Sequence, residues 1–166
     1  MSRDNKLNVL LVAAECAPFV KLGGLADVMG TLPKELNQIG ADARVMMPFH
    51  SQMKWKYASQ TRHLADFNIA FNGGEMYVGV EELVYNEVTY YLIDNEAEFG
   101  DAVYRGGVAE GEQYAYFCRA VIESLGRIGF IPDVIHCNDW QTGLIPILLR
   151  TQYGHWEVGR AKTIFT

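Results

Sequence analysis

The chain has 166 residues, of which 49% are hydrophobic, 20% charged and 12% aromatic, and its formal net charge is −6. This composition excludes disordered, collagen-like and low-complexity proteins, and it fits one soluble domain that folds without disulfides or a structural metal. The acidic balance argues against nucleic acid and anionic membranes as main partners, because both bind concentrated positive charge. We expect a small polar ligand or another protein as the partner.

The first predicted elements are a strand, a loop and a helix. Residues 7–14 form a continuous apolar run rich in branched side chains, which is typical of a strand covered on both faces. After the loop, apolar residues recur at helical spacing from Leu25, and Gly40 supplies a stop signal. A glycine and a proline interrupt this helical pattern, so we expect a kink or a break near Met29.

The middle of the chain is rich in predicted strands. Residues 43–48 indicate a second buried strand. Three partly alternating segments, 63–71, 76–84 and 87–93, are separated by turn residues and predict strands connected by hairpins. The polar, glycine-rich segment 94–107 is predicted to be a loop.

The last third of the chain returns to alternating helices and strands. The predictions are a helix from Glu112, a strand over 133–136, a helix over 139–153 and a strand over 162–166. The whole order predicts an α/β fold: a Rossmann-like, doubly wound, mostly parallel sheet with a β-rich hairpin insertion. The chain stops directly after a buried-strand pattern, and we therefore expect residues 1–166 to be a single, truncated domain.

Three cysteines, Cys16, Cys118 and Cys137, occur without the C-x-x-C spacing. Their odd number and spacing exclude a disulfide framework and a zinc knuckle, and they favour a reducing cytoplasmic setting. The first apolar run is too short for a transmembrane helix and fits a buried strand better than a signal peptide. We infer no targeting signal and no membrane segment.

The loop before the first helix contains a candidate phosphate clamp. Ligands of open α/β sheets bind beyond the carboxyl ends of the strands. Here Gly23 and Gly24 let the backbone approach a ligand, the helix start offers free N–H groups, and Lys21 adds a positive charge. Neither the GxGxxG fingerprint nor a Walker A loop occurs. By itself, Lys-x-Gly-Gly fits a flexible turn with a solvated lysine equally well. Asp27 fits either a sugar-hydroxyl acceptor or an acid that stabilises the first helical turn.

A second candidate segment runs from His136 to Leu144. It places an imidazole, an amide, a carboxylate and an indole in one strand-to-helix turn, which suits a polyhydroxylated ligand. Asp139 also fits an ordinary helix N-cap and Trp140 a core residue. A metal site made of His136, Cys137 and Asp139 is disfavoured, because neighbouring residues at a strand end point in alternating directions.

Five ordered motifs together are more specific than any one of them. They are AECAP at 14–18, KLGGLADV at 21–28, ARVMMP at 43–48, YLID at 91–94 and DVIHCNDW at 133–140. With these motifs the chain resembles the N-terminal part of bacterial glycogen synthases and plant starch synthases. These enzymes are retaining glucosyltransferases of the two-domain GT-B architecture.

The resemblance implies a binding site for the sugar donor at the KLGGLADV motif, residues 21–28. Lys21 would bind the phosphates of a sugar nucleotide, normally ADP-glucose in bacterial members. Gly23 and Gly24 would let the backbone approach the diphosphate and the glucose. Asp27 matches a family position in the substrate cleft.

The resemblance also assigns catalytic positions to Asp139 and His136, and a substrate-binding position to Tyr104. Some relatives carry histidine where this chain has Asn138 and Gln141, which leaves the roles of these two positions open. No metal and no cofactor is implied.

The implied reaction transfers glucose from ADP-glucose to the non-reducing end of an α-1,4-glucan with retention. Further basic groups and an acidic residue lie in the C-terminal domain of the family, and another histidine is expected just past Thr166. We therefore expect this chain to be inactive by itself and to work with the C-terminal domain of the same protein. One alternative is a non-catalytic α/β domain that binds a glucan or a protein. A nucleotide-dependent oxidoreductase is a weaker alternative, because the glycine fingerprint is missing.

Overall fold

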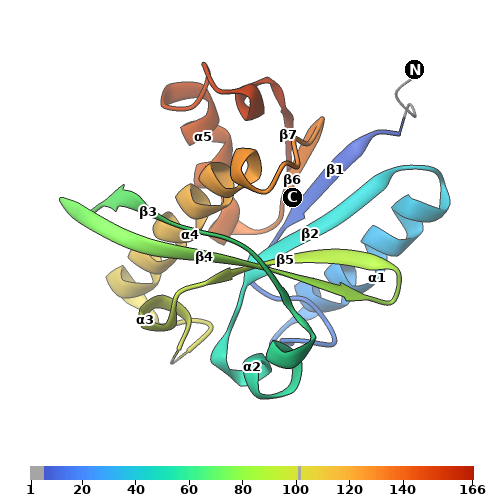
Figure 1. Cartoon of the computed structure of the whole chain (residues 1–166), viewed down its shortest axis with the longest axis horizontal. Helices are drawn as coiled ribbons and strands as arrows, with labels where there is room; N and C mark the ends of the chain where they lie inside the picture. The colour runs from blue at the N-terminus through green and yellow to red at the C-terminus, as the bar shows by residue number, and fades with distance from the viewer. Residues whose placement is uncertain (1–5, 101) are drawn as a thin grey trace.

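The computed structural model describes residues 6–100 and 102–166, and its centre is one seven-stranded sheet (Figure 1). The strand order is β3-β4-β5-β2-β1-β6-β7. Strands β5, β2, β1, β6 and β7 are parallel, and β4 runs antiparallel to both of its neighbours. The predicted mostly parallel α/β fold with a hairpin insertion is confirmed. The strands are β1 (Asn8–Val12), β2 (Asp42–Pro48), β3 (Arg62–Phe71), β4 (Gly74–Tyr85), β5 (Val88–Asp94), β6 (Val134–Cys137) and β7 (Lys162–Phe165).

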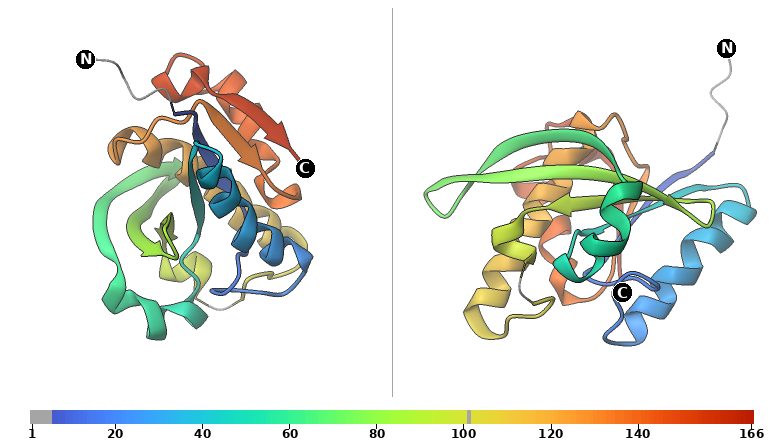
Figure 2. Two further views of the ribbon diagram at one scale, coloured as in Figure 1. Left: turned by 90° about the vertical axis from the view of Figure 1, so that its right-hand side faces the viewer. Right: turned by 60° about the horizontal axis from the view of Figure 1, so that its bottom comes forward.

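Helices cover both faces of the sheet (Figure 2). Leu10 and Val12 of β1 belong to a core that includes residues of the two C-terminal helices, whereas Val9 and Leu11 belong to a core that includes residues of the two N-terminal ones. Because alternate residues of a strand point to opposite faces, both faces of β1 must be apolar, which explains its continuous apolar run. The helices are α1 (Gly24–Gln38), α2 (Ser51–Tyr57), α3 (Glu96–Phe99), α4 (Gly107–Arg127) and α5 (Leu144–Thr151). Three short 3₁₀ turns are η1 (Ala58–Gln60), η2 (Trp140–Thr142) and η3 (Glu157–Arg160).

Helix α1 differs from its prediction because it continues without a break past Met29. Pro33 lies inside the helix and is buried with Met29 against the core. A Cβ at Gly30 would lie only 2.7 Å from the Ala17 carbonyl oxygen. Gly30 therefore serves close packing of the preceding loop, and core packing outweighs the unfavourable helix propensity of both residues.

Four further elements differ from the prediction. The short helix α2 was not predicted, and the predicted loop over 94–107 contains α3. Helix α4 begins at Gly107, five residues before the predicted start at Glu112. Its first turn is largely exposed, and Val108 is its one large apolar side chain, so it gives no apolar periodicity. The helix predicted over 139–153 is divided into η2 and α5.

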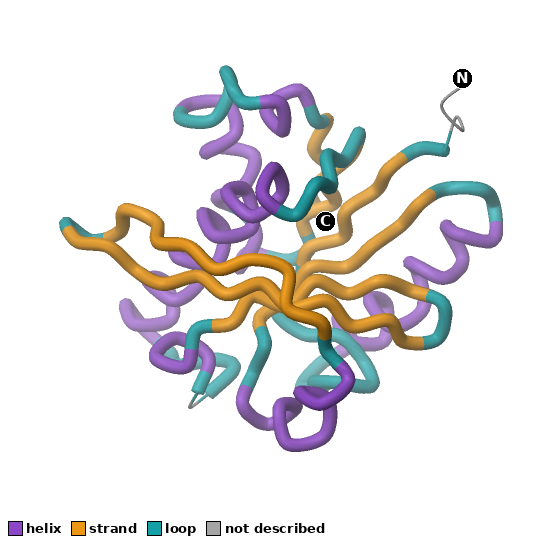
Figure 3. Tube along the Cα trace, viewed as in Figure 1, coloured by secondary structure: helices purple, strands orange, loops and turns teal. Residues whose placement is uncertain are grey.

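The hairpin insertion is formed by β3 and β4, and its tip reaches beyond the neighbouring helices (Figure 3). The turns after β3 and after β4 contain residues with positive φ, at Asn72 and Gly73 and at Asn86 and Glu87. Asparagine and glycine tolerate this conformation best, which explains three of these four positions but not Glu87. The first predicted turn is confirmed, whereas the second lies at 86–87, one residue later than the predicted 85–86.

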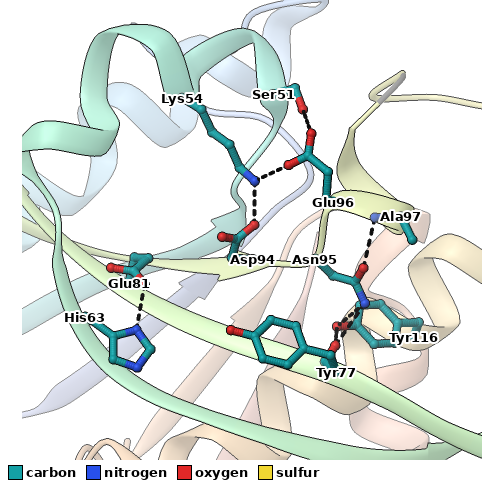
Figure 4. A network of polar contacts seen from close by, with 10 residues as sticks. All are labelled: Ser51, Lys54, His63, Tyr77, Glu81, Asp94, Asn95, Glu96, Ala97 and Tyr116. Atoms are coloured by element: carbon teal, nitrogen blue, oxygen red, sulfur yellow. Dashed lines mark hydrogen bonds and ion pairs between the residues drawn. The ribbon is translucent and has the colours of Figure 1, made fainter.

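A polar network fixes the start of the segment that follows β5 (Figure 4). Lys54 of α2 forms ion pairs with Asp94 at 2.7 Å and with Glu96 at 2.5 Å. The Asn95 side chain caps α3 and donates a hydrogen bond of 2.9 Å to the carbonyl oxygen of Tyr77 in β4. These contacts join α2, β4 and β5 and thereby anchor the loop that carries Tyr104.

Candidate functional site

The predicted site residues gather where the parallel strands end. The segment after β1 carries Lys21 and Gly23 and leads into α1, and the segments after β5 and β6 carry Tyr104 and Asp139. His136 lies within β6 itself. Since β1, β5 and β6 are parallel members of one sheet, their carboxyl ends share one edge, which is the usual ligand edge of this architecture.

The glycine-rich loop is held against α1 and leaves its lysine in solvent. The Ala17 N–H donates to the Ala26 carbonyl at 2.9 Å. The Lys21 ammonium lies 2.7 Å from the Asp27 carboxylate, and both side chains are more than half exposed. An exposed ion pair of this kind contributes little stability, so Lys21 can exchange Asp27 for another anion at small cost.

The start of α1 offers unsatisfied backbone donors to a ligand. The N-cap residue is Gly23, which provides no side-chain hydrogen bond to the helix. In a 15-residue helix, the first N–H groups then point outward with the positive end of the helix dipole. A Cβ added at Gly24 would meet no atom within 4 Å, so the backbone is open to close approach there. This geometry suits a phosphate or diphosphate.

Glu15 is a functional candidate that the sequence analysis missed. It follows β1 after two alanines and is only 2% exposed. Its Oε2 accepts a hydrogen bond of 2.6 Å from the Leu22 backbone N–H, between Lys21 and Gly23. A charged residue inside the otherwise apolar segment 13–20 is the signal that could have found it.

The segment after β6 is fixed by backbone and side-chain hydrogen bonds. Buried Asn138 donates from its side chain to the carbonyl of Val12 at 3.3 Å and to that of His136 at 3.0 Å. Its Oδ1 accepts from the Thr166 hydroxyl at 3.2 Å. Asn138 thus ties the end of β6 to the end of β1, which assigns a structural role to one of the two positions left open by the sequence analysis.

Asp139 stands in a backbone conformation that is essentially restricted to glycine, with φ 63° and ψ 170°. Its N–H donates to the Thr166 carbonyl at 2.7 Å, and its Oδ1 accepts from the Trp140 N–H at 2.7 Å. The N-cap interpretation is therefore correct for the η2 turn. The carboxylate is nevertheless exposed at the edge of the sheet. Strain of this kind at a solvent-facing acid is typical of functional sites.

Tyr104 lies within the electrostatic influence of acids in the segments after β1 and β6. Burial, together with the nearby negative charges of Glu15 and Asp139, raises its pKa to about 12. The phenol is therefore a neutral hydrogen-bond donor at physiological pH. The Tyr104 ring lies 6.2 Å from that of Tyr114, which in turn meets the half-exposed Trp140 at 5.9 Å in an edge-to-face contact. Trp140 is therefore a surface residue, and its alternative interpretation as a core residue is wrong.

His136 is placed differently from the other candidates. Its Nε2 lies 3.0 Å from the hydroxyl of Thr166, the residue after the neighbouring strand β7. Partial burial lowers the pKa of His136, which favours the neutral imidazole. Its contact with the loops is indirect, because both Thr166 and the His136 carbonyl bond to Asn138.

A second histidine, His50, lies at the end of β2 and was also missed. It is 1% exposed, and its Nε2 lies 3.0 Å from the Ala14 carbonyl. Burial lowers its pKa to about 4, so it is neutral at pH 7. A polar residue directly after a buried strand is the signal that marks it. His50 and Leu22 line a small pocket of about 150 Å³ beside the glycine-rich loop.

The three cysteines are buried and unpaired with one another. Burial raises the pKa of each thiol to about 12, so none is a reactive thiolate. In the described part of the chain, no three His, Cys, Asp or Glu side chains form a group that could hold a metal ion. None of the helices that the structure describes has the length and apolar character needed to cross a bilayer.

Comparison with known proteins decides the family. The family model described as "Starch synthase catalytic domain" matches residues 8–166. The chain belongs to this family. It is 49% identical over 149 residues to a glycogen synthase of Geobacillus thermodenitrificans (strain NG80-2), covering 90% of this chain and 31% of that protein. A glycogen synthase of Anoxybacillus flavithermus (strain DSM 21510 / WK1) is 44% identical over 162 residues, with 96% and 33% covered.

A solved starch synthase has the same fold as this chain. The catalytic domain of starch synthase IV from Arabidopsis thaliana, bound to ADP and acarbose, superimposes with a TM-score of 0.86 at 28% identity. The match covers 97% of this chain and 34% of the other. The chain thus spans about a third of the length of its starch and glycogen synthase relatives.

Proposed function

We propose that this chain is part of a retaining glucosyltransferase that moves glucose from ADP-glucose to the non-reducing end of an α-1,4-glucan. Membership of the starch synthase catalytic domain family supports this function. The observation that carries the proposal is the Lys21-x-Gly23-Gly24 loop, which opens the 15-residue helix α1 at the ligand edge of the sheet. Lys21, the open backbone and the helix start together supply what a donor diphosphate needs.

The donor half of the mechanism follows from charge. As the glycosidic bond to the diphosphate breaks, negative charge grows on the departing phosphate oxygens. Lys21, released from its exposed pair with Asp27, and the N–H groups at the start of α1 stabilise that charge where it develops. Fixed cations and dipoles of this kind can do so without a metal ion.

The sugar half of the mechanism relies on hydrogen bonds. Asp27 and Asp139 present exposed carboxylates that accept bonds from sugar hydroxyls. Tyr104, protonated at neutral pH, donates to a sugar or phosphate oxygen. We assign His136 to the same edge as a neutral imidazole, linked through Thr166 to the Asn138 side chain that holds the turn.

The proposed partners are a sugar-nucleotide donor, a glucan acceptor and the C-terminal domain of the same protein. Since the chain spans about a third of its relatives' length, we expect the 166-residue chain alone not to transfer glucose. Buried, reduced cysteines fit a cytoplasmic location for the whole protein.

The direct test is transfer by the whole protein. It is incubated with ADP-glucose and a maltooligosaccharide, while ADP release and lengthening of the glucan are followed together. Equal amounts of ADP and added α-linked glucose support the proposal. Saturable glucan binding that ADP does not affect, without any transfer, would instead support the non-catalytic binding domain.

A further inference from the structure

Glu15 is a buried acid that the proposed mechanism does not use. It is 2% exposed and lies just beyond the carboxyl end of β1, at the ligand edge of the sheet. Burying a carboxylate is unfavourable unless it is hydrogen-bonded or paired, so its contacts indicate what it is retained for.

Both carboxylate oxygens lie against the glycine-rich loop. Oε2 accepts the 2.6 Å hydrogen bond from the Leu22 N–H, which fixes the peptide between Lys21 and Leu22. Oε1 would lie 3.2 Å from a Cβ at Gly23, so that any side chain there would press on the carboxylate. Gly23 is extended, with φ −146° and ψ −169°, so this packing, and not its backbone conformation, favours glycine.

Glu15 also lies near the aromatic side of the site. Its negative charge contributes to the raised pKa values of Tyr104 and Tyr114. The Glu15 carboxylate thus contacts the glycine-rich loop directly and acts on the two tyrosines through its charge.

We propose that Glu15 is a positioning residue for the donor. It holds Lys21, Gly23 and the start of α1 in the arrangement that meets the diphosphate, and its volume is the reason that residue 23 is glycine. This inference rests on the proposed glucosyltransferase function and adds a role for a residue outside the substrate-contacting set.

Steady-state kinetics of the whole protein test the first half of the proposal. Glu15→Gln retains an oxygen that can accept from the Leu22 N–H, whereas Glu15→Ala removes it. We expect Glu15→Ala to raise the KM for ADP-glucose at least 10-fold while the KM for the glucan changes less than 2-fold. Glu15→Gln should stay within 3-fold of wild type for both. A purely structural residue would lower the melting temperature but leave the donor KM of the folded enzyme unchanged, which would overturn the proposal.

A double-mutant cycle tests the second half and does not require Glu15→Ala to fold. Gly23→Ala should weaken ADP binding, and Glu15→Asp, which is one methylene shorter, should make room for the new methyl group. We expect the combined loss of affinity to be at least 5-fold smaller than the product of the two single losses.

Gly24→Ala replaces Gly23→Ala in a control cycle, because a Cβ at Gly24 meets no atom within 4 Å. The loss of ADP affinity in the Gly24→Ala, Glu15→Asp double variant should equal the product of the two single losses. Multiplicative losses for Gly23→Ala as well would overturn the packing role. Absence of transfer by the wild-type whole protein would instead remove the proposed function, so the two failures are distinguishable.

Discussion

The strained backbone at Asp139 leads to a quantitative prediction about stability. With φ 63° and ψ 170°, Asp139 lies in a region that L-residues enter at a cost of about 1–3 kcal/mol. Glycine enters it freely but loses about 0.5–1 kcal/mol more than alanine through its conformational freedom in the unfolded chain. The difference between the middle values of these two ranges predicts that Asp139→Gly is more stable than Asp139→Ala by about 1 kcal/mol. Both variants lose the same carboxylate and its bond to Trp140, so their comparison isolates the backbone.

The assay is urea unfolding followed by circular dichroism, with an internal control at Gly111. Gly111 is exposed inside α4, and a Cβ there meets no atom within 4 Å. At this position alanine should be more stabilising than glycine, as is usual inside a helix, so Gly111→Ala should be more stable than wild type by up to about 1 kcal/mol. If Asp139→Ala is as stable as Asp139→Gly, the strain argument is refuted. In the whole protein we also expect Asp139→Gly to remain folded and to lose transfer, because a proposed catalytic carboxylate is gone.

Two further predictions concern the residues around the glycine-rich loop. His50 has a folded pKa of about 4, below the ordinary value of about 6.5, so protons bind the unfolded chain first as pH falls. The free energy of unfolding should therefore drop between pH 6.5 and 4 by up to about 3 kcal/mol more in wild type than in His50→Gln, measured by urea titrations across that range. Parallel pH profiles for the two proteins would contradict the buried, neutral imidazole. Gly30→Ala should destabilise the chain by about 1–3 kcal/mol, because the new Cβ would lie 2.7 Å from the backbone oxygen of Ala17. Gly126→Ala, in open space at the end of α4, is the control, and equal melting temperatures for the two variants would argue against the clash.

Most of the sheet could be predicted from the sequence because burial on two faces leaves a simple pattern. The continuous apolar run at 7–14 predicts a strand that is covered on both faces, and both faces of β1 are indeed buried in core clusters. Helix α2 has only seven residues, too few for a recognisable period, and α4 begins with a largely exposed, glycine-containing turn that shows no apolar period. The prediction of a break in α1 was wrong for a different reason. Local propensity at Gly30 and Pro33 was outweighed by tertiary packing that only the structure reveals.

The candidate site was predictable as a set of loops but not as a set of contacts. Lys21, the two glycines and Asp139 stood out because their residue types are unusual in loops that lead from a buried strand into a helix. The sequence did not indicate that Glu15 turns back onto the Leu22 N–H, or that Asp139 occupies a glycine-like conformation. Both features depend on where neighbouring strands end relative to one another, and that arrangement arises only when the sheet assembles.

The central claim is that Lys21 and the start of α1 bind the donor diphosphate. The most direct measurement is the affinity of the whole protein for ADP by isothermal titration calorimetry, in wild type, Lys21→Ala and Lys34→Ala. Lys34 is an exposed lysine on the same helix, loosely paired with Glu87 at 3.8 Å, and provides a matched loss of charge. We predict that Lys21→Ala weakens ADP binding by about 1–3 kcal/mol, or roughly 5- to 150-fold, the scale of a lost charged hydrogen bond. Lys34→Ala should bind like wild type. Equal affinities for wild type and Lys21→Ala would contradict the account.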